Sequence, residues 1–123
     1  MRISEAESVV MQVLWQATGP QSAEDIVAQV AAGQDWQEAT VKTLLNRLLK
    51  KQAIAAERDG RRYLYRARLA RETWMSEQSR SFLDRLYGGQ VSALVAHFSR
   101  NQALSREEIE EIRALIEAID DGK

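Results

Sequence analysis

Basic side chains are concentrated between residues 42 and 68, and their chemistry is that of phosphate binding. This range holds nine Lys or Arg residues but only two acidic ones, Glu57 and Asp59, although the formal net charge of the whole chain is −1. Residues 105–123 have the opposite balance, with three basic and seven acidic residues. Clustered Lys and Arg residues neutralise the phosphates of nucleic acids. The sequence therefore predicts one basic face that could bind nucleic acid, and one acidic end.

The basic range begins in a segment, WQEATVKTLLNRLLKKQAI at residues 36–54, that is typical of an amphipathic helix. At about 100° per residue, four aliphatic side chains gather on one side: Val41, Leu44, Leu45 and Leu48. The other side has no acidic residue from residue 39 to residue 56, whereas a merely solvated helix face usually pairs both charge signs. Its short side chains would let the backbone approach a DNA groove, while Lys and Arg reach phosphates or guanine edges. The DNA-binding residues predicted on this helix are Ala39, Thr40, Lys42, Thr43, Asn46, Arg47 and Lys50.

Residues 54–67 predict a β-hairpin directly after this helix. Asp59-Gly60 is a strong signal for a two-residue turn, and the aromatic and aliphatic residues 63–65 suit a strand. Arg58, Arg61 and Arg62 lie at or beside the turn, where a wing would meet the adjacent DNA backbone or minor groove. We therefore predict that these three arginines also bind DNA.

Two more helices are predicted before these elements. Ser4 with Glu7, and Ser22 with Asp25, are patterns that begin helices. Three helices followed by a hairpin is the order of a winged helix-turn-helix. We therefore predict a mainly α fold, with a winged helix-turn-helix DNA-binding domain at residues 1–68. Winged helices also serve as protein-interaction modules, so a module within a larger assembly is the alternative function.

The rest of the chain, residues 69–123, has only helical patterns. Gly88-Gly89 ends the first of them, and Ser105 with Glu108 begins the last. Large apolar residues recur at helical spacing, and a helical unit of this size cannot easily bury them all. We predict that this region forms a homodimer; folding back onto the N-terminal domain is the alternative. The predicted dimerisation residues are Trp74, Phe82, Leu83, Leu86, Val91, Leu94, Val95, Phe98, Ile109, Ile112, Ile116 and Ile119.

Several classes of chemistry have no candidate residues. The chain has no cysteine and one histidine, His97, which has neither a neighbouring nucleophile nor partners at metal-ligand spacing. The acidic cluster of residues 107–111 begins a helix and suits solvated surface. We therefore predict no enzymatic activity, no metal ion and no cofactor. No apolar run approaches the roughly 18 residues that cross a membrane, and the first residues have no signal-peptide core, so we expect a cytoplasmic protein without membrane insertion.

Five segments together resemble the penicillinase-repressor (BlaI/MecI/CopY) family of bacterial transcriptional repressors. They are ISEAESVVMQVLW (residues 3–15), TVKTLLNRLLKK (40–51), RDGRRYLY (58–65), SFLDRLYGG (81–89) and LSREEIEEI (104–112). The resemblance implies a homodimer that binds dyad operators, commonly with TACA/TGTA half-sites, and blocks transcription of resistance or metal-homeostasis genes. By position, it places Thr40, Lys42, Thr43 and Arg47 against double-stranded DNA and Arg61 in the wing.

The resemblance also implies how the repressor could be released. Copper-responsive members use a cysteine-rich motif, which this chain lacks. In β-lactam-responsive members, a membrane sensor metalloprotease triggers cleavage, typically at an Asn-Phe bond, and the matching pair here is His97-Phe98. Phe98 could equally be a buried anchor of its helix, and the two roles are compatible. Two departures stand out: Gln37-Glu38 replaces a frequent Ser-Pro, and Gln52 replaces a frequent Gly.

Overall fold

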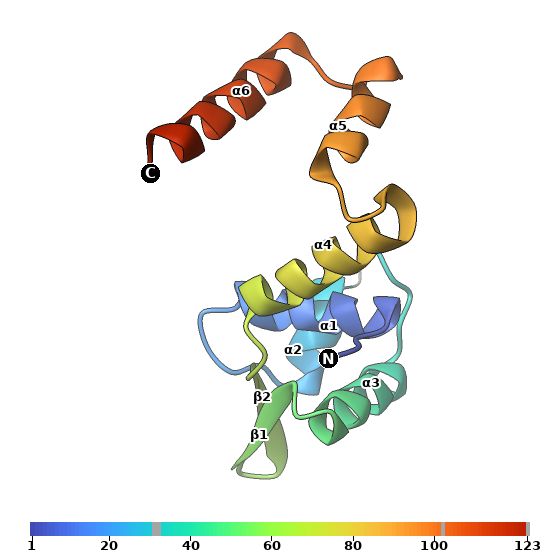
Figure 1. The fold of residues 1–123 in the computed structure, drawn as a ribbon. Helices are drawn as coiled ribbons and strands as arrows, with labels where there is room; N and C mark the ends of the chain where they lie inside the picture. Colours follow the sequence, from blue (N-terminus) through green and yellow to red (C-terminus); the bar gives the residue numbers. More distant parts are fainter. Residues whose placement is uncertain (31–32, 102, 123) are drawn as a thin grey trace. The chain divides into compact units, whose positions relative to one another are not determined.

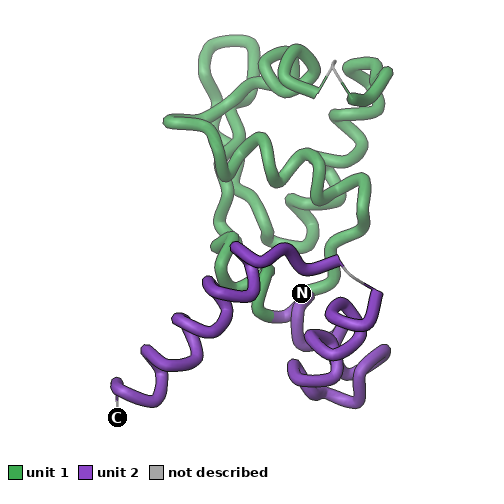
Figure 2. Tube along the Cα trace, turned by 90° about the horizontal axis from the view of Figure 1, so that it is seen from above, with its two compact units in different colours: residues 1–76 green, residues 77–123 purple. Residues whose placement is uncertain are grey.

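A computed structural model of the chain describes residues 1–30, 33–101 and 103–122. The chain forms two compact units, residues 1–76 and residues 77–123, which Figure 2 draws in different colours. The division falls within helix α4 (Arg71–Tyr87), whose first turns belong to the first unit. The boundary predicted after residue 68 is a functional one, between DNA-binding and dimerising residues. It is not tested by this structural division and stays a prediction.

The first unit contains three helices and a two-stranded hairpin. Its elements are α1 (Glu5–Gln16), α2 (Ala23–Val30), α3 (Glu38–Lys50), β1 (Ile54–Asp59) and β2 (Arg62–Ala67) (Figure 1). The strands pair antiparallel, with Ile54 opposite Ala67 and Asp59 opposite Arg62, and Gly60 takes the positive φ of +65° that the tight turn needs. The predicted fold class, mainly α with an N-terminal winged helix-turn-helix, is confirmed.

Reciprocal hydrogen bonds begin the first two helices where the sequence predicted them. The Ser4 hydroxyl accepts from the Glu7 amide at 3.1 Å, and the Glu7 carboxylate accepts from the Ser4 amide at 2.8 Å. Ser22 and Asp25 form the same pair of bonds, at 3.1 and 3.0 Å. These bonds satisfy amide groups that would otherwise have no partner at a helix start.

The core of the first unit lies between α1, α2 and α3 and is closed on one side by the hairpin. Fully buried members include Met11, Ile26, Leu45, Leu48 and Ile54. The four aliphatic residues predicted on the inner side of α3 are all buried. A strand-like bridge between Gln21 and Tyr65 attaches β2 to the segment before α2. These contacts fix the hairpin relative to α3.

The start of α4 completes this core. Trp74 packs against it, with its ring centroid 5.4 Å from that of Trp15. The Trp15 indole nitrogen donates to the Leu69 carbonyl at 2.8 Å. Trp74 was predicted among the dimerisation residues, but in the single chain its large indole fills a position on the N-terminal core.

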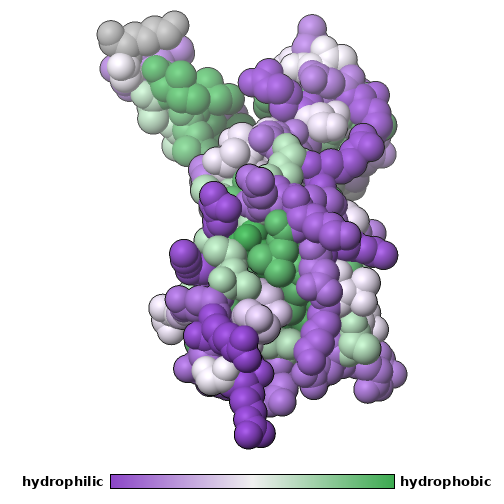
Figure 3. All heavy atoms as spheres, turned by 90° about the horizontal axis from the view of Figure 1, so that it is seen from below, coloured by the Kyte–Doolittle hydropathy of each residue, from purple (hydrophilic) through white to green (hydrophobic). Residues whose placement is uncertain are grey.

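The second unit consists of the remainder of α4, α5 (Val91–Arg100) and α6 (Arg106–Asp121). None of the described residues in this unit is buried. Among the predicted dimerisation residues, Leu83, Leu94, Val95 and Ile112 are half-buried, while Phe82, Leu86, Val91, Phe98, Ile109, Ile116 and Ile119 are exposed. Apolar side chains gather on one side of α6 (Figure 3). No helix in the described part of the chain is both long and apolar enough to span a membrane.

Candidate nucleic-acid interface

The outer side of α3 presents all seven residues that the sequence predicted for DNA binding. Each of them is exposed. The Thr43 hydroxyl donates to the Ala39 carbonyl at 3.0 Å, which turns the Thr43 side chain toward its own helix. Near the start of the helix, the Lys42 ammonium lies 3.1 Å from the Glu38 carboxylate. The outer side therefore combines short side chains, which permit close approach, with long basic ones.

The hairpin holds two of its three predicted arginines beside the turn. Arg58 donates to the Gly60 carbonyl at 3.2 Å, and its guanidinium lies 5.9 Å from the centroid of the Tyr63 ring. Arg62 forms a salt bridge of 3.2 Å with Asp59. Among the described residues, Arg61 has no such partner, and the same is true of Arg47 and Lys50 on α3. The charges of these three predicted DNA-binding residues are therefore available for a phosphate.

A hollow of about 410 Å³ joins the outer side of α3 to the hairpin. Lys42 lines it from α3, and Arg61 and Arg62 line it from the hairpin. The structure thus brings these three predicted residues into one concave surface. The full lining is Ser22, Ala23, Glu24, Glu38, Lys42, Arg61, Arg62, Tyr63 and Tyr65.

The start of α2 belongs to this surface, although sequence reasoning did not include it. The Ser22–Asp25 pattern marked it only as the beginning of a helix. Hydrogen bonds from the amide and hydroxyl of Ser22 hold the pKa of Asp25 below its usual value, and the positive charge of Arg62 adds to this effect. Burial raises the pKa of Tyr65, while Lys42 partly opposes that change. Arg62 on the hairpin thus contributes to the lowered pKa of Asp25 on α2, and Lys42 on α3 influences the pKa of Tyr65 in the hollow.

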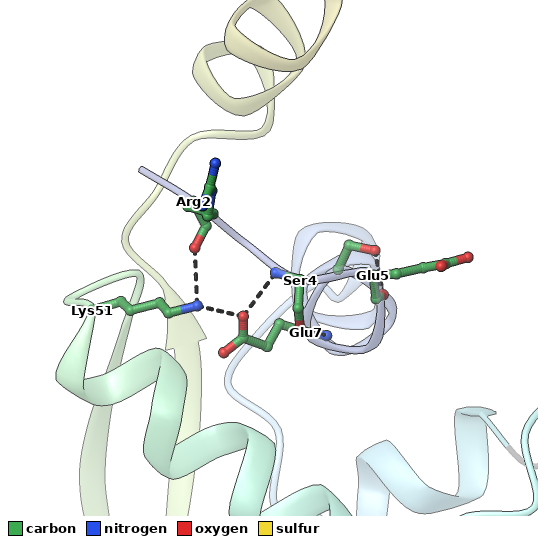
Figure 4. Close-up of polar contacts among 6 residues, drawn as sticks. Arg2, Ser4, Glu5, Glu7 and Lys51 are labelled. Carbon is green, nitrogen blue, oxygen red and sulfur yellow. Dashed lines mark hydrogen bonds and ion pairs between the residues drawn. The ribbon is translucent and has the colours of Figure 1, made fainter. Parts of the chain in front are cut away.

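A partly buried ion pair fixes the end of α3 against α1 (Figure 4). Lys51 donates to the Glu7 carboxylate and to the Arg2 carbonyl, the latter at 2.9 Å. The Glu7 side chain is 1% exposed, and its second oxygen, Oε2, has no hydrogen-bond partner among the described residues. Burial alone would raise the pKa of Glu7, but hydrogen bonds from Lys51 and Ser4 outweigh that effect and hold the pKa below its usual value. Lys51 therefore stabilises the fold and does not belong to the outer basic side of α3.

The single histidine of the sequence, His97, lies in the second unit. The ring centroid of His97 is 6.1 Å from that of Tyr87 and 5.9 Å from that of Phe98. The Asn101 amide nitrogen lies 3.4 Å from its Nε2. Over the described ranges, no three His, Asp or Glu side chains come together as a candidate metal site.

Comparison with known proteins gives relatives that match nearly the whole chain. Residues 3–118 match the family described as penicillinase repressor. The penicillinase repressor of Bacillus licheniformis is 33% identical over 116 residues, covering 94% of this chain and 90% of that protein. The penicillinase repressor of Staphylococcus aureus is 32% identical over 119 residues, covering 97% of this chain and 94% of that protein.

A solved structure extends the likeness to the fold. It is the solution structure of the Bacillus licheniformis BlaI monomeric form in complex with the blaP half-operator. The identity is 28% and the TM-score 0.50, over 58% of this chain and 87% of that one. The relatives are repressors rather than enzymes, which agrees with the expectation from the sequence. The resemblance inferred from the five segments is confirmed: this chain belongs to the penicillinase repressor family.

Proposed function

We propose that this protein represses transcription by binding operator DNA as a homodimer. Helix α3 enters the major groove, and the hairpin contacts the adjacent backbone or minor groove. The observation that carries this proposal is the outer side of α3, which is exposed, basic and lined by short residues, beside a hairpin with three arginines at or next to its turn. That arrangement suits both base contacts and phosphate contacts.

The first unit supplies the DNA contacts in this proposal. Ala39, Thr40 and Thr43 allow the α3 backbone to approach the groove, and Asn46 can hydrogen-bond to a base. Arg47, Lys50 and Arg61 are exposed cations without a salt bridge among the described residues. The likeness to BlaI bound to a half-operator supports the same use of this unit.

The second unit supplies the dimer contacts. Its exposed apolar residues lie at helical spacing on α4, α5 and α6, and apolar surface of this extent favours association. Most soluble homo-oligomers are two-fold dimers, so each subunit would present one α3 to one half of a dyad operator. We accordingly assign residues 1–68 to DNA binding and residues 69–123 to dimerisation.

A gel shift with the DNA upstream of the protein's own gene tests the proposal. Affinity should fall steeply with salt, with a log–log slope near −0.9 per phosphate neutralised. Arg47→Ala should cost about 1–3 kcal/mol at the selected site, whereas Arg106→Ala, an equal charge loss on α6, should leave the affinity almost unchanged. Weak, non-selective binding with no effect of Arg47→Ala would instead favour a protein-interaction module.

Release by proteolysis is the finer part of this proposal. His97 and Phe98 lie together on α5 and are both exposed. A cut between them would separate α6 from α4 and so divide the dimerisation region. A membrane sensor metalloprotease would be the trigger, as the family resemblance implies. Mass spectrometry of the protein from induced cells tests this step, and an intact chain in derepressed cells would contradict it.

A further inference from the structure

Glu38 is the single carboxylate on α3, and it stands in the first turn of the helix. Its side chain is 45% exposed and that of Lys42 is 59% exposed, so neither group is committed to the core. Both line the hollow shared with the hairpin. A carboxylate at this place repels phosphate, so it weakens binding to DNA in general. On a DNA-binding helix, this carboxylate favours binding only where it meets a hydrogen-bond donor on the DNA.

Base edges offer such a partner, because residues near the start of a recognition helix contact them. A carboxylate only accepts hydrogen bonds. In the major groove, the amino group N4 of cytosine is a donor, whereas the amino group of adenine lies beside the acceptor N7, which repels a carboxylate. Guanine presents only acceptors there. Cytosine is therefore the base that suits Glu38.

The salt bridge between Glu38 and Lys42 matches the edge of a whole base pair. Within a C·G pair, cytosine N4 and guanine O6 are joined by a hydrogen bond and so lie about 3 Å apart. The Glu38 carboxylate oxygen and the Lys42 ammonium nitrogen lie 3.1 Å apart. The carboxylate can accept from N4 while the ammonium donates to O6, without the two side chains separating. If the base pair were reversed, the carboxylate would face the acceptor O6 and the ammonium would face the donor N4, so neither hydrogen bond could form.

We propose that Glu38 and Lys42 read one C·G base pair in each half of the operator, with Glu38 determining the preference for cytosine. This inference rests on the proposed function, because it needs α3 in the major groove. It gives Glu38 a role in selectivity at some cost in affinity, since phosphate repulsion acts on every sequence but the contact with N4 forms only at cytosine.

Selection from a random duplex library tests the proposal with full-length protein. The wild type should enrich a dyad with cytosine at one fixed position in each half-site. Glu38→Gln should lose cytosine there, shifting toward adenine, which glutamine can bind through N6 and N7. Glu24→Gln removes an equal charge from the same hollow but from α2, so it should raise affinity for all sequences and leave the motif unchanged.

A modified base tests the contact at the level of one atom. N4-methylcytosine at the selected position replaces the hydrogen that faces the major groove, and it should weaken wild-type binding by on the order of ten-fold but leave Glu38→Gln unaffected. The same motif for the wild type and for Glu38→Gln would overturn the inference while leaving the proposed function standing. Failure of the wild type to enrich any sequence would overturn the proposed function itself.

Discussion

The two units of the chain differ in how much of their apolar surface the chain itself covers. Residues 1–76 bury a continuous core in which Val10, Met11, Ile26, Leu45 and Leu48 are completely inaccessible. Among the described residues of 77–123, no side chain is buried. Eight large apolar residues there are exposed: Phe82, Leu86, Val91, Phe98, Ile109, Leu115, Ile116 and Ile119.

This difference indicates that the two units are stabilised in different ways. The first has enough internal burial to fold as a single chain, since apolar burial is the main favourable term in folding. The helices of the second leave their apolar sides without cover, and short isolated helices are marginal in water. We therefore expect the second unit to depend on association and the first unit not to.

The largest expected effect comes from a charge on the apolar side of α6. Ile116→Glu should convert the proposed dimer to a monomer. Its two-fold interface would lose two apolar side chains and gain two charges, a cost of about 4 kcal/mol. Sedimentation velocity measures the change in mass. All three tryptophans, Trp15, Trp36 and Trp74, lie in the first unit, so their unfolding transition should stay in place. A variant that remains dimeric would contradict a role for Ile116 in association.

The reverse experiment truncates a core residue of the first unit. Leu45 is completely buried, so Leu45→Ala should lower the free energy of unfolding of that unit by about 3 kcal/mol, through lost burial and the cavity left behind. Urea unfolding followed by tryptophan fluorescence measures this loss. In the absence of urea, the variant should keep the dimeric state that we propose for the wild type. A monomeric but folded Leu45→Ala protein would show that the two units are not independent.

The ion pair of Lys51 with Glu7 gives an intermediate effect that depends on pH. Lys51→Met leaves a buried carboxylate without its cation, and it should cost about 2 kcal/mol at neutral pH, less than a fully buried pair because the Lys51 side chain is 36% exposed. In the wild type the pKa of Glu7 is lowered below its usual 4.5. Its stabilising contribution is therefore present above that pH and is lost as the pH falls through the folded-state pKa.

The difference in stability between Lys51→Met and the wild type should consequently shrink as the solution is acidified below 4.5, the usual pKa of a glutamic acid. Removing the hydrogen bond from Lys51 leaves burial as the main influence, which moves the pKa of Glu7 upward. Urea unfolding at several pH values measures how the stability of each protein, wild type and Lys51→Met, depends on pH. A difference that is independent of pH would mean that Lys51 stabilises the fold by packing alone.

The sequence predicted the elements of the first unit well because their signals are local. Two capping patterns, one turn dipeptide and the aliphatic spacing of α3 each act within a few residues. The contacts that position these elements relative to one another join residues far apart in the chain, and no local sequence pattern predicts them. Lys51 counted only as one more basic residue, and its bond to Glu7 spans 44 positions. The place of the start of α2 in the hollow and the packing of Trp74 on the core also depend on contacts between distant residues, so the sequence pattern did not predict them.

The smallest expected effect concerns the end of α3, where Gln52 stands at a position for which the family resemblance implies a glycine. Gln52 has φ of +63°, a left-handed conformation that costs a residue with a side chain about 1 kcal/mol or more. The Gln52 amide donates to the Leu49 carbonyl at 3.0 Å and the Ala53 amide to the Leu48 carbonyl at 3.0 Å, which is the hydrogen-bond pattern that glycine usually closes.

Gln52→Gly should therefore stabilise the first unit by up to about 1 kcal/mol, because the strain is relieved by more than the added freedom of the unfolded chain takes away. The gain should be visible in the tryptophan-monitored unfolding of Ile116→Glu as well as of the wild type, since both share the same first unit. Gln52→Ala is the matched control: it also removes the side chain but keeps a Cβ, so it should give no comparable gain. Equal stabilisation by both substitutions would assign the effect to the Gln52 side chain rather than to backbone strain.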